Sequence, residues 1–249
     1  MIKNSNKGNI MKIIAHRAGP NVYPEQTITS ASFALYCGAD MVEVDVRYTK
    51  DKVLAVSHDA NTKRVFGCDQ KVSDMTANEF LALRHLKDIS FGSHLLEHFL
   101  IKEISPLLIH IKQDEVIDDL LALLKKYDYL DKVTFGVMSE SGVKKIKSFD
   151  NNLKVLAFMP SVNDIVKFVS AGADYIRLWE NWVNDDTVNA VKNSGAKLWV
   201  MTGKITENDT DVGVSTEDGL KKLIDYQVDG ILINDITILQ DVLELTEQK

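Results

Sequence analysis

The chain has 249 residues, of which 45% are hydrophobic and 26% are charged, and its formal net charge is -7 at pH 7. A chain of this length and composition can bury one large core. The acidic balance argues against a nucleic-acid partner, because phosphate backbones are bound by basic stripes or patches.

Several protein classes are excluded by what the sequence lacks. Residues 1–11 are polar and have no apolar run of the signal-peptide type, so we expect a disordered lead-in before a single domain over residues 12–249. No apolar segment approaches the roughly 18 residues that a membrane span needs. Cys37 and Cys68 make neither a disulfide framework nor a zinc motif. We therefore expect a cytoplasmic protein with no integral membrane segment, and the sequence leaves its oligomeric state open.

Short β-branched segments alternate with longer amphipathic stretches along the chain. In chain order, the predicted strands are 12–15, 41–46, 107–111, 133–137, 154–158, 175–178, 197–201 and 230–233. The predicted helices between and after them include 115–126, 141–148, 162–171, 187–194 and 217–226. Gly38, Gly172 and Gly195 each stand before a predicted strand, where glycine ends the preceding helix in a left-handed conformation. This alternation is typical of parallel strands joined by helical crossovers.

Eight such strands predict a closed α/β structure, a (β/α)8 TIM-like barrel, rather than an open sheet. An additional strand at 52–57 and the mixed, short patterns of about 59–98 predict a small insertion after the second barrel strand. In barrels of this kind the functional residues lie at the carboxyl ends of the strands. We therefore expect the functional residues at those positions.

Polar residues follow five of the predicted strands. They are His16-Arg17, the alternating pair Glu43 and Asp45, His58-Asp59, the alternating pair His110 and Lys112, and Asn234-Asp235. Residues two apart in a strand point to the same face of the sheet. Each fragment alone is a weak signal, but their common placement at strand ends predicts one site.

Glu43 and Asp45 form the most informative pair, since two buried carboxylates without partners cost several kcal/mol each. A divalent cation would neutralise them, and carboxylate oxygens suit hard cations such as Mg²⁺, Ca²⁺ or Mn²⁺. A structural salt bridge to Arg17 or Lys112 is the alternative, and the sequence leaves it open.

One reaction accounts for the whole set. Cleavage of a phosphodiester requires neutralised phosphate charge, a deprotonated nucleophile and a protonated leaving oxygen. A metal ion with Arg17 and Lys112 would meet the first requirement. His16 and His58 would meet the other two as base and acid near neutral pH.

At these residues the sequence resembles the glycerophosphodiester phosphodiesterase family, whose ordered motifs are His-Arg, Pro-Glu-Asn-Thr, Glu-x-Asp and His-Asp. They stand here as His16-Arg17, Pro24-Glu25-Gln26-Thr27, Glu43-Val44-Asp45 and His58-Asp59. The resemblance implies a TIM-like barrel and a hydrolase of lipid metabolism that converts a small-molecule glycerophosphodiester to glycerol 3-phosphate and an alcohol. It leaves open whether water or the neighbouring glycerol hydroxyl attacks.

The resemblance also implies roles for individual residues. His16 and His58 would be the catalytic acid–base pair, Glu43 and Asp45 metal ligands, Arg17 and Lys112 phosphate-binding groups, and Glu25 and Trp199 supporting residues. Trp199 is what remains here of the family's late Trp-Thr-x-Asn motif.

The third barrel strand departs from the family pattern. Where the family has Ile-Glu-Ile-Lys, this chain has Ile109-His110-Ile111-Lys112. We expect His110 to take the place of the third metal ligand. The family binds Mg²⁺ or Ca²⁺, whereas a nitrogen ligand favours Mn²⁺ or Zn²⁺. The alternative is that His110 packs against Glu43 without a metal.

Other functions stay open at this point. Because the third ligand and the late motifs depart from the family pattern, the chain is alternatively a pseudoenzyme that binds a phosphorylated ligand. The apolar character of residues 80–100 also leaves open a phosphodiesterase for lysophospholipids or sugar phosphodiesters. The segment His94-Leu95-Leu96-Glu97-His98 matches an inverted zinc-protease pattern with two histidines on one helical face. Ser215 is expected to cap the next helix, and residues 203–213 to form either a mobile loop over the site or a disordered surface loop.

Overall fold

Eight parallel strands close into a barrel in the computed structural model, which describes residues 11–204 and 211–247. Each strand pairs with the next around the ring, and pairing of the first two strands, Ile14 with Met41 and Ala15 with Val42, closes it. The barrel strands are β1 (Lys12–Ala15), β2 (Met41–Tyr48), β5 (Leu107–Ile111), β6 (Val133–Val137), β7 (Lys154–Ala157), β8 (Tyr175–Trp179), β9 (Lys197–Met201) and β10 (Gly230–Ile233). The predicted (β/α)8 barrel is confirmed. Residues 1–10 of the expected lead-in and residues 205–210 of the expected loop at 203–213 lie outside the described residues.

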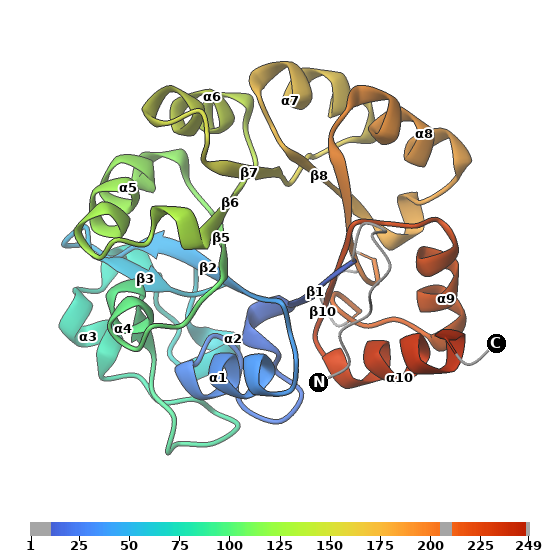
Figure 1. Ribbon diagram of the computed structural model, residues 1–249. Helices are drawn as coiled ribbons and strands as arrows, with labels where there is room; N and C mark the ends of the chain where they lie inside the picture. The colour runs from blue at the N-terminus through green and yellow to red at the C-terminus, as the bar shows by residue number, and fades with distance from the viewer. Residues whose placement is uncertain (1–10, 205–210, 248–249) are drawn as a thin grey trace.

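Helices surround the ring of strands on the outside (Figure 1). They are α1 (Ile28–Tyr36), α4 (Leu96–Ile101), α5 (Ile117–Lys126), α6 (Glu140–Phe149), α7 (Ile165–Ala171), α8 (Asp185–Ser194), α9 (Glu217–Asp225) and α10 (Ile236–Glu247). Gly172 and Gly195 end α7 and α8 in the left-handed region, as predicted. The predicted cap at Ser215 is wrong: Thr216 accepts the N–H of Gly219, which starts α9 one residue later.

The predicted insertion is a small antiparallel extension of β2. Strand β3 (Leu54–Val56) pairs with β2, and β4 (His94–Leu95) pairs with β3. The short helices α2 (Lys63–Phe66) and α3 (Ala77–Leu81) lie between them, in the cyan part of Figure 1. This segment has its own hydrophobic cluster around Phe80, and it carries His58 and Asp59 to the barrel mouth.

The two faces of each barrel strand have different surroundings. Outward residues such as Val42, Val44 and Val46 pack in the main core beneath the helices. Inward residues near the amino ends of the strands fill the barrel with apolar side chains, namely Ile14, Leu108, Leu156, Trp199 and Leu232. At the next inward positions toward the carboxyl ends, β7 and β9 carry the apolar Phe158 and Met201, whereas other strands carry polar side chains, namely His16, Glu43, His110, Arg177 and Asn234. The strand alternation therefore places a polar layer directly above an apolar floor.

Gly136 on β6 makes room for one wall of this layer. A Cβ at this position would lie 2.5 Å from the Phe158 ring and 3.3 Å from the His110 Cα. Phe158 instead stacks on the His110 ring, with centroids 3.9 Å apart. We expect Gly136→Ala to lower the free energy of unfolding by about 1–3 kcal/mol, because an added methyl in a packed interior forces its neighbours to shift. Urea denaturation measures this, and an unchanged midpoint would show that Phe158 moves freely.

Candidate active site

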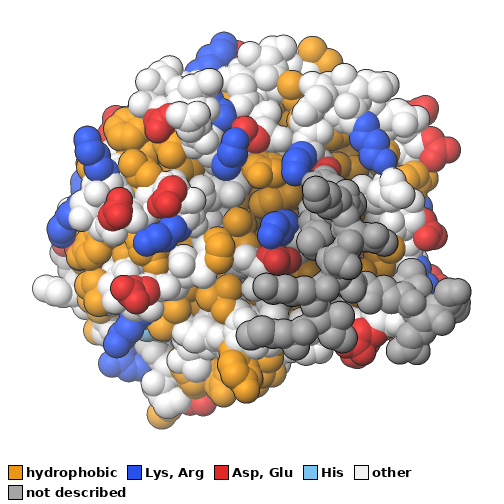
Figure 2. Space-filling view, viewed as in Figure 1, with side chains coloured by type: hydrophobic (Ala, Val, Ile, Leu, Met, Phe, Trp, Pro, Cys, Tyr) orange, Lys and Arg blue, Asp and Glu red, His pale blue; other side chains and the backbone are white. Residues whose placement is uncertain are grey.

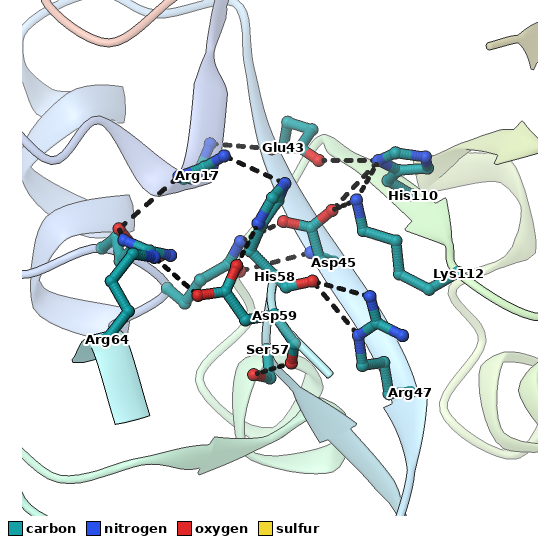
Figure 3. Close-up of polar contacts among 12 residues, drawn as sticks. Arg17, Glu43, Asp45, Arg47, Ser57, His58, Asp59, Arg64, His110 and Lys112 are labelled. Carbon is teal, nitrogen blue, oxygen red and sulfur yellow. Dashed lines mark hydrogen bonds and ion pairs between the residues drawn. The ribbon is translucent and has the colours of Figure 1, made fainter. Parts of the chain in front are cut away.

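Two buried carboxylates lie at the centre of the polar layer (Figure 3). Glu43 and Asp45 on β2 are 1% and 0% exposed. The Nδ1 atom of His110 lies 3.0 Å from Asp45 Oδ1 and 3.7 Å from Glu43 Oε1. One ligand atom from each of the three residues falls within 4.8 Å of the others. The structure thus brings together the three residues that the sequence suggested for a metal.

Lys112 forms an ion pair with one of these carboxylates. Its Nζ lies 2.7 Å from Asp45 Oδ1 and 3.1 Å from His110 Nδ1. Burial acts to raise the pKa of Asp45, but the charges of Lys112 and His58 outweigh it, and the pKa lies well below its ordinary value. Asp45 is therefore ionised, and the salt bridge to Lys112 considered from the sequence is present.

The buried negative charge of Glu43 is compensated less well than that of Asp45. Its Oε2 accepts the backbone N–H of Arg17 at 2.7 Å. Burial and the neighbouring charge of Asp45 raise the pKa of Glu43 well above its ordinary value. The pair of carboxylates consequently favours additional positive charge at this position.

The donor set fits a divalent cation. Burial and the charge of Lys112 lower the pKa of His110 to about 3, so this imidazole is neutral and has a lone pair for a metal. The Nε2 atom of His110 is buried without a hydrogen-bond partner in the described chain. Two carboxylates and one neutral imidazole are ligands that Mn²⁺ or Zn²⁺ accept readily.

His16 is held in one orientation by a residue from the opposite end of the chain. It is 3% exposed, and its Nδ1 lies 2.7 Å from Asn234 Oδ1. The Asn234 amide nitrogen donates to the Val212 carbonyl, so its oxygen faces His16 and the imidazole donates from Nδ1. Burial and the charge of Arg17 lower the pKa of His16 well below its ordinary value. His16 is therefore neutral, with an unprotonated Nε2.

His58 belongs to a chain of charged groups. Its Nδ1 lies 2.7 Å from Asp59 Oδ1, and Arg17 Nη2 lies 2.9 Å from its Nε2. Arg64 bonds the second Asp59 oxygen and both oxygens of Glu25. Burial acts to raise the pKa of Asp59, but hydrogen bonds from His58 and Arg64 hold it well below its ordinary value. Arg64 thus links Glu25 to Asp59, and Figure 3 shows Arg17 between Glu43 and His58.

A cavity of about 300 Å³ opens onto these groups. His16, His58, His110 and Lys112 line it, together with the aromatic residues Phe158, Trp179 and Trp182. Figure 2 shows hydrophobic and basic side chains around the middle of the face viewed along the barrel. Trp199 does not line this cavity; it is 2% exposed in the barrel floor, 4.5 Å from the Tyr175 ring. A supporting role for Trp199 is therefore one of packing beneath the site.

Three contributors were not assigned from the sequence. Gln26, from the Pro-Glu-Gln-Thr motif, makes two hydrogen bonds to Asp45. Its amide nitrogen donates to the Asp45 carboxylate, and its amide oxygen accepts the Asp45 backbone N–H. Asn234 was noticed only as a polar residue after the last strand. Arg177 lines the cavity from the middle of β8, where no motif marks it.

The inverted zinc-protease pattern does not form a metal site. His94 lies in strand β4, whereas helix α4 begins at Leu96. The Glu97 carboxylate accepts hydrogen bonds from Lys126 and Tyr127 instead of turning toward the histidines. Among the described residues, the set with three convergent ligand atoms is Glu43, Asp45 and His110.

A closed barrel with a polar layer at the carboxyl ends of its strands is the architecture of a barrel enzyme. The model of the glycerophosphoryl diester phosphodiesterase family matches residues 16–186, more than half of the chain, and the chain belongs to this family. The enzyme class expected from the sequence is confirmed at this level.

Individual relatives and a solved structure agree with the family assignment. The chain is 25% identical over 240 residues to a glycerophosphodiester phosphodiesterase from Caldanaerobacter subterraneus subsp. tengcongensis, a match covering 90% of this chain and 93% of the relative. It is 37% identical over 82 residues to Lysophospholipase D GDPD1 from Homo sapiens, covering 33% of this chain and 26% of that protein. The fold matches an Oleispira antarctica phosphodiesterase, solved in complex with the product sn-glycerol-3-phosphate, with a TM-score of 0.78, 17% identity and coverage of 94% and 96%.

None of the helices in residues 11–204 and 211–247 combines the length and apolar character needed to span a membrane.

The contact between Asn234 and His16 gives a test of this geometry. Asn234→Ala removes the acceptor at Nδ1, so the imidazole no longer has one preferred tautomer. We expect kcat for diester hydrolysis to fall about tenfold or more, within the range assigned to general acid–base catalysis, while KM changes little. Steady-state kinetics separates the two constants. A change confined to KM would place Asn234 in substrate binding instead.

Proposed function

We propose that this protein hydrolyses a glycerophosphodiester to glycerol 3-phosphate and an alcohol in a reaction that depends on a divalent metal ion. The observation that carries this proposal is the shared cavity: His16 and His58 line it together with His110 and Lys112, directly beside the buried carboxylate pair. Family membership and the product bound in the Oleispira antarctica structure support the substrate class.

Charge on the phosphate would be neutralised by groups on several strands. Arg17 stands next to His58, and Lys112 stands next to Asp45. Their guanidinium and ammonium groups suit phosphate oxygens. When bound to Glu43, Asp45 and His110, a divalent ion supplies Lewis-acid stabilisation of the same charge.

Proton transfer divides between the two histidines. His16 is neutral and presents Nε2, which suits it to accept a proton from the attacking hydroxyl, whether of water or of the glycerol moiety. His58 Nδ1 lies 2.7 Å from an oxygen of the ionised Asp59, which orients the ring so that Nε2 points toward Arg17. We assign His16 as the base and His58 as the acid that protonates the leaving oxygen.

A screen of phosphodiesters against Mg²⁺, Ca²⁺, Mn²⁺ and Zn²⁺ tests this proposal. The panel includes glycerophosphodiesters and a lysophospholipid, because part of the chain resembles a human lysophospholipase D. We expect release of glycerol 3-phosphate with at least one metal and loss of activity in EDTA. A folded, metal-loaded protein that cleaves none of the diesters would favour the pseudoenzyme that binds a phosphorylated ligand.

A further inference from the structure

Arg177 is a buried cation that the proposed reaction does not use. Its side chain is 5% exposed in the middle of β8 and lines the same cavity as the two histidines. Its Nε and Nη1 atoms are buried and have no hydrogen-bond partner among the described residues. Buried charged donors are normally paired, because leaving them unpaired is costly.

No carboxylate compensates this charge in the described part of the chain. Burial alone lowers the pKa of Arg177 to about 9, and no neighbouring acidic group raises it. The guanidinium therefore remains charged at neutral pH, and its Nε and Nη1 nitrogens are unused donors. Asp45 is already paired with Lys112.

Aromatic rings surround the guanidinium. Its Cζ lies 4.2 Å from the ring centroid of Trp179, 5.3 Å from that of Phe158 and 5.8 Å from that of Trp182. Such rings otherwise make a site for a quaternary ammonium group. Here the aromatic faces already contact Arg177, and a second cation in the same cavity would be repelled.

We infer that Arg177 is a specificity-determining residue that binds an anionic group, a carboxylate or a second phosphate, on the alcohol part of the diester. The inference rests on the proposed function and names its substrate class. The planar fork of arginine donors matches the oxygens of either group. The phosphodiester at His16 and His58 and the anion at Arg177 would occupy one continuous cavity. Diesters of choline are correspondingly poor ligands.

Binding can be measured without turnover in a His16→Ala protein by calorimetry. Glycerophosphoglycerate and glycerophosphoglycerol form a matched pair, since they differ by a carboxylate in place of a hydroxymethyl group. Glycerophosphoglycerol phosphate gives the phosphate arm, and glycerophosphocholine the cationic one. We expect the anionic diesters to bind at least about tenfold more tightly than the neutral one, as hydrogen bonds to charged groups imply. The larger gain identifies which anion fits.

The variant Arg177→Met should abolish this preference, and Arg177→Lys, which keeps the charge but not the fork, should reduce it. Arg84→Met, at an exposed arginine outside the cavity, is the matched control and should retain it. Equal binding of neutral and carboxylate diesters, or a preference that survives Arg177→Met, would overturn the assignment of Arg177 alone. If neither glycerol 3-phosphate nor any of the diesters binds, the proposed function falls together with this inference.

Discussion

Replacing His16 with alanine is expected to lower kcat for glycerophosphodiester hydrolysis by about 10²–10⁴-fold, the range attributed to a positioned general base. The imidazole is neutral, buried and oriented by Asn234. Metal binding should persist, because His16 is not among the three convergent ligands. The measurement is steady-state release of glycerol 3-phosphate at saturating metal.

His94→Ala serves as the control for this experiment. It removes a histidine from the insertion, outside the cavity, and should leave hydrolysis of the diester unchanged. The opposite result, with activity lost in His94→Ala and kept in His16→Ala, would contradict the assignment and favour the zinc-peptidase interpretation of that segment.

Replacing Glu43 with glutamine is expected to reduce divalent-metal affinity by at least about tenfold to a hundredfold, because a ligand is lost. The stability of the metal-free protein should not fall with the metal affinity, and should stay the same or rise. The folded-state pKa of Glu43 is raised, so the folded protein holds this proton more tightly than the unfolded chain does. Above the ordinary pKa the ionised carboxylate therefore destabilises the metal-free fold. In EDTA at pH 7, Glu43→Gln should show an unchanged or higher melting temperature.

Melting curves with and without Mn²⁺ measure both effects. The wild-type protein should be stabilised by the metal, whereas Glu43→Gln should lose most of that shift. Glu97→Gln, which changes a carboxylate bonded to Lys126 and Tyr127 outside the site, is the control. An undiminished metal shift in Glu43→Gln would remove this residue from the ligand set.

Much of the barrel could be predicted from local sequence. Its strands are continuous apolar runs because both faces of a parallel barrel strand are buried, and β1, β5, β6, β9 and β10 were predicted with the observed bounds. The remaining errors lie at the ends of elements: β2 continues to Tyr48, and the cap of α9 is Thr216 because the Ser215 hydroxyl bonds Glu180. Ser215 and Thr216 are both good capping residues, and only the packing of Glu180 decides between them.

The site residues that lie within one strand were predictable, because alternation along a strand fixes which side chains share a face. That logic places Glu43 beside Asp45 and His110 beside Lys112. It does not pair His16 with Asn234, which are 218 residues apart and meet only because β1 closes against β10. Nor does it mark Arg177, since an isolated arginine in an apolar strand gives no sign of lacking a partner until its surroundings are known.

Crystals soaked with Mn²⁺ and glycerol 3-phosphate give the most direct test of the central claim, that this barrel binds the product of phosphodiester cleavage beside a metal. We predict anomalous density for one ion coordinated by Glu43, Asp45 and His110, with the phosphate contacting Arg17 and Lys112. A soaked crystal with an ordered site but neither ion nor phosphate at these residues would contradict the account.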